Sequence, residues 1–228
     1  EDRFIDYTNA VESNNLHPKL KEKIYSILPK ELKNLPNLIF YGPEGVGKYS
    51  QALYCIKKYS SSELKYEKKI SIELQKGIYN LKISDVHFEV DMDMLGCNSK
   101  TIWNEIYSHI IDIINSSSTH RGIILCKNFQ NVNNELLDIF YSYMQDNSQI
   151  KYILLSSELS FIPDIVLNKF EIINVSMFIK TLGSKYINKK YIKTNNIKYS
   201  KDNIDIFNNI CDKYSVKLIN HIKEYKTI

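Results

Sequence analysis

The sequence predicts an α/β domain with a central parallel sheet, followed by a small helical domain. Two observations lead to this prediction. Short apolar segments alternate with amphipathic helical segments up to about residue 175, and the pattern then becomes purely helical. Apolar runs without polar alternation are typical of strands buried on both faces, as in parallel sheets flanked by helices. We therefore expect a base domain over residues 1–175 and a helical domain over residues 176–228.

The first elements surround a glycine-rich loop. Apolar residues at helical spacing predict a helix over residues 16–28, with Pro18 near its start and a linker after it. The apolar run 37–41 predicts a buried strand that ends at Gly42, and residues 48–59 predict the helix that follows the loop.

The rest of the chain continues this alternation. Residues 68–90 hold several short alternating stretches, which predict strands because a period of two is strand-like. The later predicted elements are helix 99–115, strand 122–126, helix 134–145, strands 151–155 and 170–175, and helices 178–186, 202–213 and 215–225.

The loop between the first predicted strand and its helix matches the pattern G-x-x-x-x-G-K. In a phosphate loop, glycines let backbone N–H groups surround a phosphate chain, and the helix N-terminus adds positive potential. A lysine neutralises the outer phosphates. We therefore expect ATP or ADP as a cofactor. The expected binding residues of the loop are Gly42, Pro43, Glu44, Gly45, Val46, Gly47 and Lys48.

Two departures from the phosphate-loop pattern argue against hydrolysis. Tyr49 stands where Ser or Thr ligates Mg²⁺, and Ser50 replaces that hydroxyl only if the helix start shifts. Lys127 and Asn128 follow the strand 122–126, where phosphate-loop ATPases carry a carboxylate pair. A lysine repels Mg²⁺, and an asparagine cannot accept a proton from water. We therefore expect no metal site, and Mg²⁺ binding that is weak or absent.

Composition adds few constraints. Thirty Lys and Arg against 26 Asp and Glu give a net charge of +4, which permits a nucleic-acid partner without indicating one. The four cysteines form no C-x-x-C pair, so we expect a reduced, intracellular and metal-free chain. No apolar run is long enough to predict a membrane span. Asp91 and Asp93 could hold Mg²⁺, but we expect solvated charges in a loop.

Over roughly residues 15–220 the chain resembles the small subunits of replication factor C, the clamp loader of the AAA+ superfamily. It looks most like the subunit whose phosphate loop reads Gly-Lys-Lys-Thr, because residues 47–50 carry the same displaced hydroxyl. Residues 86–99 are similar to a segment of that subunit, and residues 127–145 align with the family's Asp-Glu-Ala-Asp strand end and the helix after it. The resemblance implies an AAA+ base followed by a helical lid.

The resemblance also implies roles for four further residues. Ser157 falls at a polar sensor position near the γ-phosphate, and Lys217 falls near the sensor arginine of the lid. Lys169 falls at the arginine finger that reaches a neighbouring subunit, where lysine keeps the charge but loses the planar fork. Lys100, at a helix start, is the candidate for contact with the DNA backbone, or is simply an exposed lysine. The family's collar domain is expected to be absent, since the chain ends at Ile228.

The implied function is that of a catalytically degenerate clamp-loader subunit, which helps load the sliding clamp onto primed DNA and binds ATP without hydrolysing it. Its partners would be other AAA+ subunits, the sliding clamp and the backbone of primed double-stranded DNA, in the nucleus or in a viral replication compartment. One alternative is a clamp-loader-like body reused as a structural or interaction protein in another assembly. Another is an active ATPase or nucleotide kinase, which would need a carboxylate at the strand end.

Overall fold

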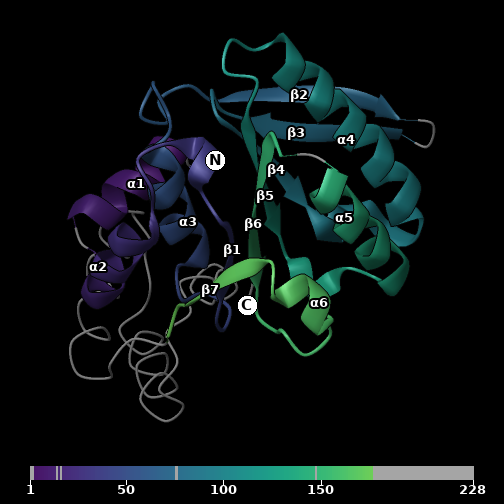
Figure 1. Ribbon diagram of the computed structural model, residues 1–228. Coiled ribbons are helices and arrows are strands. Elements are labelled where there is room, and N and C mark those ends of the chain that lie inside the picture. The colour runs from purple at the N-terminus through teal and green to yellow at the C-terminus, as the bar shows by residue number, and fades with distance from the viewer. Residues whose placement is uncertain (1–2, 14, 16, 75–76, 147, 177–228) are drawn as a thin grey trace, which may run out of the picture.

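A seven-stranded sheet forms the centre of the computed structural model, which describes residues 3–13, 15, 17–74, 77–146 and 148–176 (Figure 1). The order of the strands across the sheet is β2-β3-β4-β5-β6-β1-β7. The strands are β1 (Asn37–Tyr41), β2 (Lys68–Leu74), β3 (Gly77–Ile83), β4 (His87–Asp91), β5 (Gly122–Lys127), β6 (Ile150–Ser156) and β7 (Phe170–Asn174).

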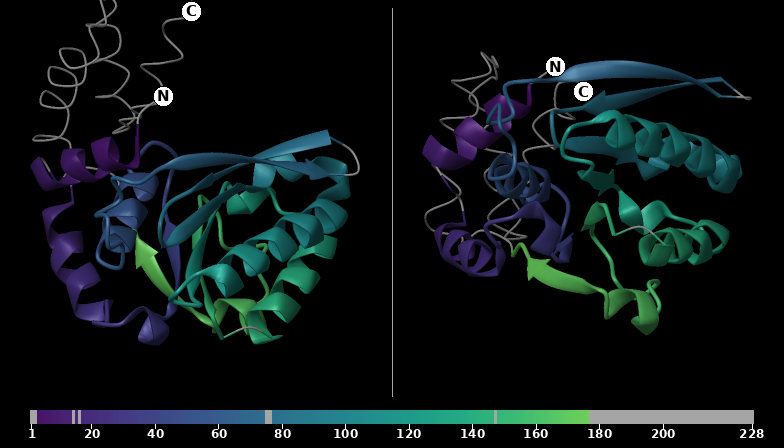
Figure 2. Two further views of the ribbon diagram at one scale, coloured as in Figure 1. Left: turned by 90° about the horizontal axis from the view of Figure 1, so that it is seen from above. Right: turned by 45° about the horizontal axis from the view of Figure 1, so that its top comes forward.

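Helices cover both faces of the sheet (Figures 1 and 2). One face carries α1 (Phe4–Ser13), α2 (Pro18–Ile27) and α3 (Lys48–Lys57). The other carries α4 (Ser99–Ser116), α5 (Asn134–Asp146) and the short α6 (Asp164–Leu167). Three 3₁₀ turns complete the described elements: η1 (Leu32–Asn34), η2 (Met92–Asn98) and η3 (Phe129–Asn131).

The central strands are buried on both faces, which explains their unbroken apolar runs. In β1, Leu38 and Phe40 pack in the core beneath α1, α2 and α3, whereas Ile39 packs in the core beneath α4 and α5. All three side chains are fully buried. On the second face Trp103 of α4 packs against Phe140 of α5, with ring centroids 5.2 Å apart.

Five adjacent strands confirm the predicted central parallel sheet: β4, β5, β6, β1 and β7 run parallel to one another. The antiparallel edge was not predicted. β2 pairs antiparallel with β3, and β3 pairs antiparallel with β4. Only two residues separate β2 from β3 and three separate β3 from β4, whereas a parallel crossover needs a dozen or more.

Helix α1 was also not predicted, because its apolar signal is short. Phe4, Thr8 and Val11 form its buried stripe, and only two of these are apolar. The helix is held by distant groups: the backbone N–H of Phe4 donates to Glu67 Oε2 over 2.8 Å, and the Phe4 ring lies 4.7 Å from the ring of His87. As a result, α1 lies beside α3, next to the glycine-rich loop.

The sheet order places this loop where α/β sheets bind ligands. α3 follows β1 on one face, and α6 follows the neighbouring strand β6 on the other. Such a reversal opens a crevice at the carboxyl ends of the strands. The start of the loop is fixed to both neighbours of β1, since Gly42 N–H donates to Ser156 O over 3.2 Å and Val175 N–H donates to Tyr41 O over 2.7 Å.

The predicted lid, residues 176–228 with its three helices, falls outside the described residues apart from Ser176, so it stays a prediction. No helix in the described part of the chain combines the length and the apolar character that crossing a membrane requires.

Gly42→Ala should lower the free energy of unfolding by about 3 kcal/mol or more. An added Cβ at this position would lie 2.2 Å from the backbone oxygen of Val175, which cannot move without shifting β7. Gly47→Ala is the matched control: its φ of 90° is unfavourable for alanine, but its Cβ would meet no heavy atom within 4 Å. We expect that variant to lose only about 1–2 kcal/mol. Urea unfolding followed by circular dichroism measures both, and equal losses would contradict the clash.

Candidate nucleotide-binding site

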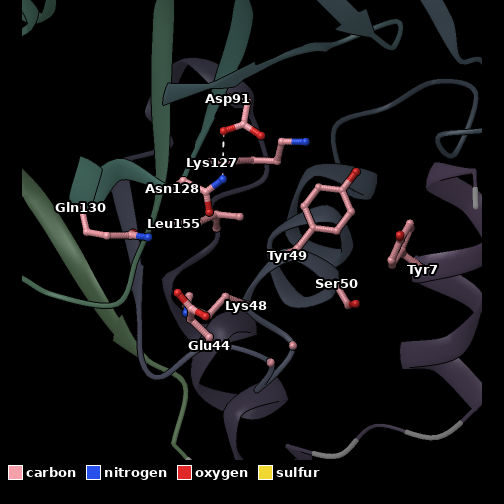
Figure 3. A pocket seen from close by; sticks show the side chains of 12 residues that line it. Tyr7, Glu44, Lys48, Tyr49, Ser50, Asp91, Lys127, Asn128, Gln130 and Leu155 are labelled. Atoms are coloured by element: carbon pink, nitrogen blue, oxygen red, sulfur yellow. Dashed lines mark hydrogen bonds between the residues drawn. The ribbon is translucent and has the colours of Figure 1, made fainter. Parts of the chain in front are cut away.

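A pocket of about 400 Å³ lies at the carboxyl ends of the parallel strands (Figure 3). Some of its residues come from the loop, the first turn of α3, and α1. Others come from the ends of β4, β5 and β6 and from the turn that follows β5. The lining residues are Glu44, Gly45, Gly47, Lys48, Tyr49, Ser50, Asp91, Lys127, Asn128, Gln130, Leu155 and Tyr7.

The loop and the start of α3 offer backbone donors to this pocket. Gly45 and Gly47 have φ values of 72° and 90°, a left-handed conformation that glycine adopts without strain. Gly47, the residue at the N-cap of α3, has no side chain to cap the helix, so the first N–H groups of α3 offer donors to an anion. Within the described part of the chain, a Cβ on Gly47 would meet no heavy atom within 4 Å, which leaves space above the helix start. This geometry fits a phosphate group.

Lys48 lies across the loop. Its ammonium donates to the carbonyl oxygens of Gly42 and Pro43 over 2.5 and 2.7 Å. Burial lowers the pKa of Lys48, and the charge of Glu44 partly offsets this effect. A phosphate bound in the loop would exchange these neutral carbonyls for charged oxygens, which make stronger hydrogen bonds with ammonium.

Three of the predicted loop residues, Gly42, Pro43 and Val46, do not line the pocket but support the residues that do. Gly42 and Pro43 contribute the carbonyls that hold Lys48. The side chain of Val46 is buried in the core, and its carbonyl oxygen lies 2.8 Å from Nε2 of His17. His17, which the sequence did not single out, thus holds the middle of the loop against the start of α2.

The hydroxyl of Tyr49 is bound to a buried carboxylate. Its phenol donates to Oε1 of Glu89 over 2.6 Å, and its ring meets that of Tyr7 edge-on at 4.8 Å. Burial first, and then the charge of Glu89, raise the pKa of Tyr49 far above its ordinary value, so the phenol is a neutral donor. The other predicted hydroxyl, Ser50, lines the pocket one residue further along α3.

Glu89 is a buried carboxylate, 3% exposed, beneath this tyrosine. Nε2 of His87 lies 3.7 Å from Oε1, and Nζ of Lys127 lies 3.6 Å from Oε2. Burial alone would raise the pKa of Glu89, but His87, Lys127 and the Tyr49 hydroxyl together hold it below its ordinary value. Glu89 is therefore ionised in a site that is closed to solvent.

The end of β5 and the residue after it carry no carboxylate. Both residues at this position, Lys127 and Asn128, line the pocket. Lys127 is the last residue of β5, and Asn128 follows with a left-handed φ of 54°. The amide of Asn128 donates to Oδ1 of Asp91 over 2.9 Å (Figure 3).

Asp91 corrects the sequence analysis, which placed it in a solvated loop. It is the last residue of β4 and lines the pocket, half-buried. The alternation of His87, Glu89 and Asp91 along one face of β4 is the signal that could have indicated this. Asp93 is exposed and accepts a hydrogen bond from Asn131. No group of three or more His, Cys, Asp or Glu within the described ranges could hold a metal ion.

The residues implied by the resemblance lie at varying distances from the pocket. Ser157 follows β6, and its backbone N–H donates to Oε1 of the pocket residue Gln130 over 3.3 Å. Lys169 is exposed and precedes β7, which pairs with β1. It lies at the amino ends of these parallel strands, whereas the loop follows the carboxyl end of β1. Lys100 is exposed in the first turn of α4. Lys217 lies outside the described residues.

No family model matches the chain, and no curated protein matches it. Among solved structures, it is similar to a RuvB variant from Thermotoga maritima, with 15% identity and a TM-score of 0.46 over 81% of this chain and 51% of that one. PCH-2 of C. elegans shows 11% identity and a TM-score of 0.45 over 86% and 51%. The chain spans about half the length of both proteins. Residue roles do not transfer at this level of similarity, so the function is argued from the pocket itself.

Tyr49→Phe should destabilise the protein by about 1–3 kcal/mol at pH 7, because a buried carboxylate oxygen loses its shortest hydrogen bond. Tyr25→Phe is the matched control: its hydroxyl also bonds to a neighbour, but the side chain is half exposed, and we expect a change within about 0.5 kcal/mol. Urea unfolding measures both variants. Equal effects would show that the Tyr49 hydroxyl contributes no more than an exposed one.

The ionisation of Glu89 should appear as a pH dependence of stability. Its pKa is lower in the folded protein than in the unfolded chain, so its contribution is present above the ordinary glutamate pKa of about 4.3 and is lost as the pH falls through the folded value. Comparison with Glu89→Gln removes the contributions of other groups. The stability of the wild type relative to this variant should fall when urea unfolding is repeated from pH 7 down to pH 3. A difference that stays constant with pH would contradict the assignment.

Proposed function

We propose that this chain binds the phosphates of ATP or ADP at the Gly42–Lys48 loop and does not hydrolyse them. The uncapped start of α3, the open space above Gly47 and the ammonium of Lys48 support phosphate binding. These features combine backbone N–H groups with a positive charge, as phosphate loops do.

The observation that carries the second half of the proposal is the identity of the residues at the end of β5. Lys127 and Asn128 line the pocket where hydrolysis requires carboxylates to hold Mg²⁺ and to orient water. Two carboxylates do line the pocket. Glu44 is exposed in the loop beside Lys48, and Asp91 accepts a hydrogen bond from Asn128. Neither is paired with a second carboxylate.

We place this activity in an AAA+ assembly of the clamp-loader type. The parallel sheet, with the loop after its first strand, is the base that such a subunit needs. Lys169 precedes β7 beside the start of β1, at the end of the strand opposite the loop, so an assembly role would direct it to a neighbour's site. Lys100 would face the DNA backbone. The partners are then other AAA+ subunits, a sliding clamp and primed DNA, in the nucleus or a viral replication compartment.

The other outcome is a clamp-loader-like body that serves as a structural or interaction protein in another assembly. The pocket fits this alternative equally well, because a bound nucleotide that is never hydrolysed can act as a structural cofactor. The subunits that copurify with the chain decide between them: AAA+ subunits and a sliding clamp support loading, and an assembly without either supports the alternative.

The purified chain should bind ADP in isothermal titration calorimetry and should release no phosphate from ATP above background. Lys48→Ala should weaken ADP binding about tenfold or more, since a hydrogen bond to a charged group contributes roughly 1.5–3 kcal/mol. Lys23→Ala is the control, because Lys23 is exposed on α2 and does not line the pocket. Phosphate release that is lost in both Lys48→Ala and Asp91→Asn would instead identify an active ATPase with Asp91 as its carboxylate.

A further inference from the structure

Lys127 lines the pocket and lies next to the buried carboxylate of Glu89. Its ammonium lies 3.6 Å from Oε2 of Glu89, too far for a hydrogen bond, and 5.7 Å from the ring centre of Tyr49. Its side chain is 32% exposed, whereas that of Glu89 is 2% exposed. Among the described residues, Oε2 of Glu89 has no hydrogen-bond partner. The carboxylate therefore attracts the ammonium without using its N–H donors.

The ammonium of Lys127 makes this part of the pocket unfavourable for a divalent cation. Mg²⁺ requires oxygen ligands in octahedral geometry at about 2.0–2.1 Å. The phenol of Tyr49 at the start of α3 is already bound to Glu89. Asp91, the carboxylate beside Lys127, accepts a hydrogen bond from Asn128. An ammonium at this strand end would also repel the metal.

We propose that the ammonium of Lys127 supplies the positive charge that a divalent cation supplies in hydrolytic phosphate loops, so that the pocket binds the phosphate chain of a nucleotide in its metal-free form. This inference rests on the proposed function and names the ligand state that the same site selects.

Two lysines then share the charge of the phosphate chain. Lys48 reaches the pocket from the start of α3, and Lys127 reaches it from the end of β5 (Figure 3). A nucleotide without Mg²⁺ carries more negative charge than its metal complex, so it benefits more from a second fixed cation. The Tyr49–Glu89 hydrogen bond keeps the carboxylate beneath Lys127 and away from the phosphates.

The test is calorimetric titration of ADP in EDTA and in excess Mg²⁺. For the wild type, excess Mg²⁺ should raise the dissociation constant about threefold or more, because it converts ADP to a metal complex that the ammonium of Lys127 disfavours. Lys127→Met keeps an unbranched side chain one atom shorter and removes its charge, and should weaken metal-free binding about tenfold or more, as expected for the loss of a charge-assisted hydrogen bond.

A second variant controls for damage to the buried carboxylate. Lys127→Met combined with Glu89→Gln removes both charges together and should show the same weakening, whereas Lys23→Met on the far side of α2 should bind ADP as the wild type does. Mg²⁺ that leaves wild-type binding unchanged or tightens it would overturn the inference. So would a double variant that binds metal-free ADP as tightly as the wild type.

The two proposals fail in different ways. If the wild type binds metal-free ADP and only Lys48→Ala weakens it, the loop is a nucleotide site and the role of Lys127 is wrong. If the wild type binds ADP in neither condition, or if Lys48→Ala has no effect, the proposed function is wrong and this inference with it.

Discussion

The burial of an ionised carboxylate within the sheet is the constraint on which the pocket depends. Taking Glu89 out of water costs several kcal/mol unless partners compensate for the lost hydration. The compensation comes from three elements: the hydroxyl of Tyr49 on α3, the ring of His87 on β4 and the ammonium of Lys127 on β5. Because Tyr49 directly follows Lys48, satisfying the carboxylate also fixes the first turn of α3 and the end of the loop.

Phosphate binding and hydrolysis place different demands on such a site. Binding uses backbone N–H groups, a helix start and one lysine, and the pocket contains all three. Hydrolysis uses side-chain oxygens at the end of another strand of the sheet, and β5 offers an ammonium and an amide instead. The backbone geometry follows from the fold, so it persists whatever side chains stand at the strand ends. The side-chain chemistry of the site does not follow from the fold, because it depends on which residues stand at the strand ends.

The features that the sequence did not predict depend on pairing between distant segments. Helix α1 has too little apolar surface to be recognised alone, and it is stabilised by contacts with Glu67 and His87. The antiparallel edge formed by β2 and β3 follows from short connections, whereas the prediction of parallel pairing came from the buried strands at the centre. Asp91 was placed in a loop because the end of β4 could not be located within an alternating stretch.

By itself, the sequence determined the alternation of strands and helices around the central parallel strands, the position of the phosphate loop and the absence of carboxylates at residues 127 and 128. These are local properties, since hydrophobic period, glycine spacing and residue identity can be read without knowing what packs where. Only the tertiary structure decided that Tyr49 binds Glu89, 40 residues away, and that Asn128 binds Asp91, 37 residues away. The physical reason is the lateral order of the strands: side chains far apart in the chain meet only because β4 pairs with β5 and α3 packs across the same face of the sheet.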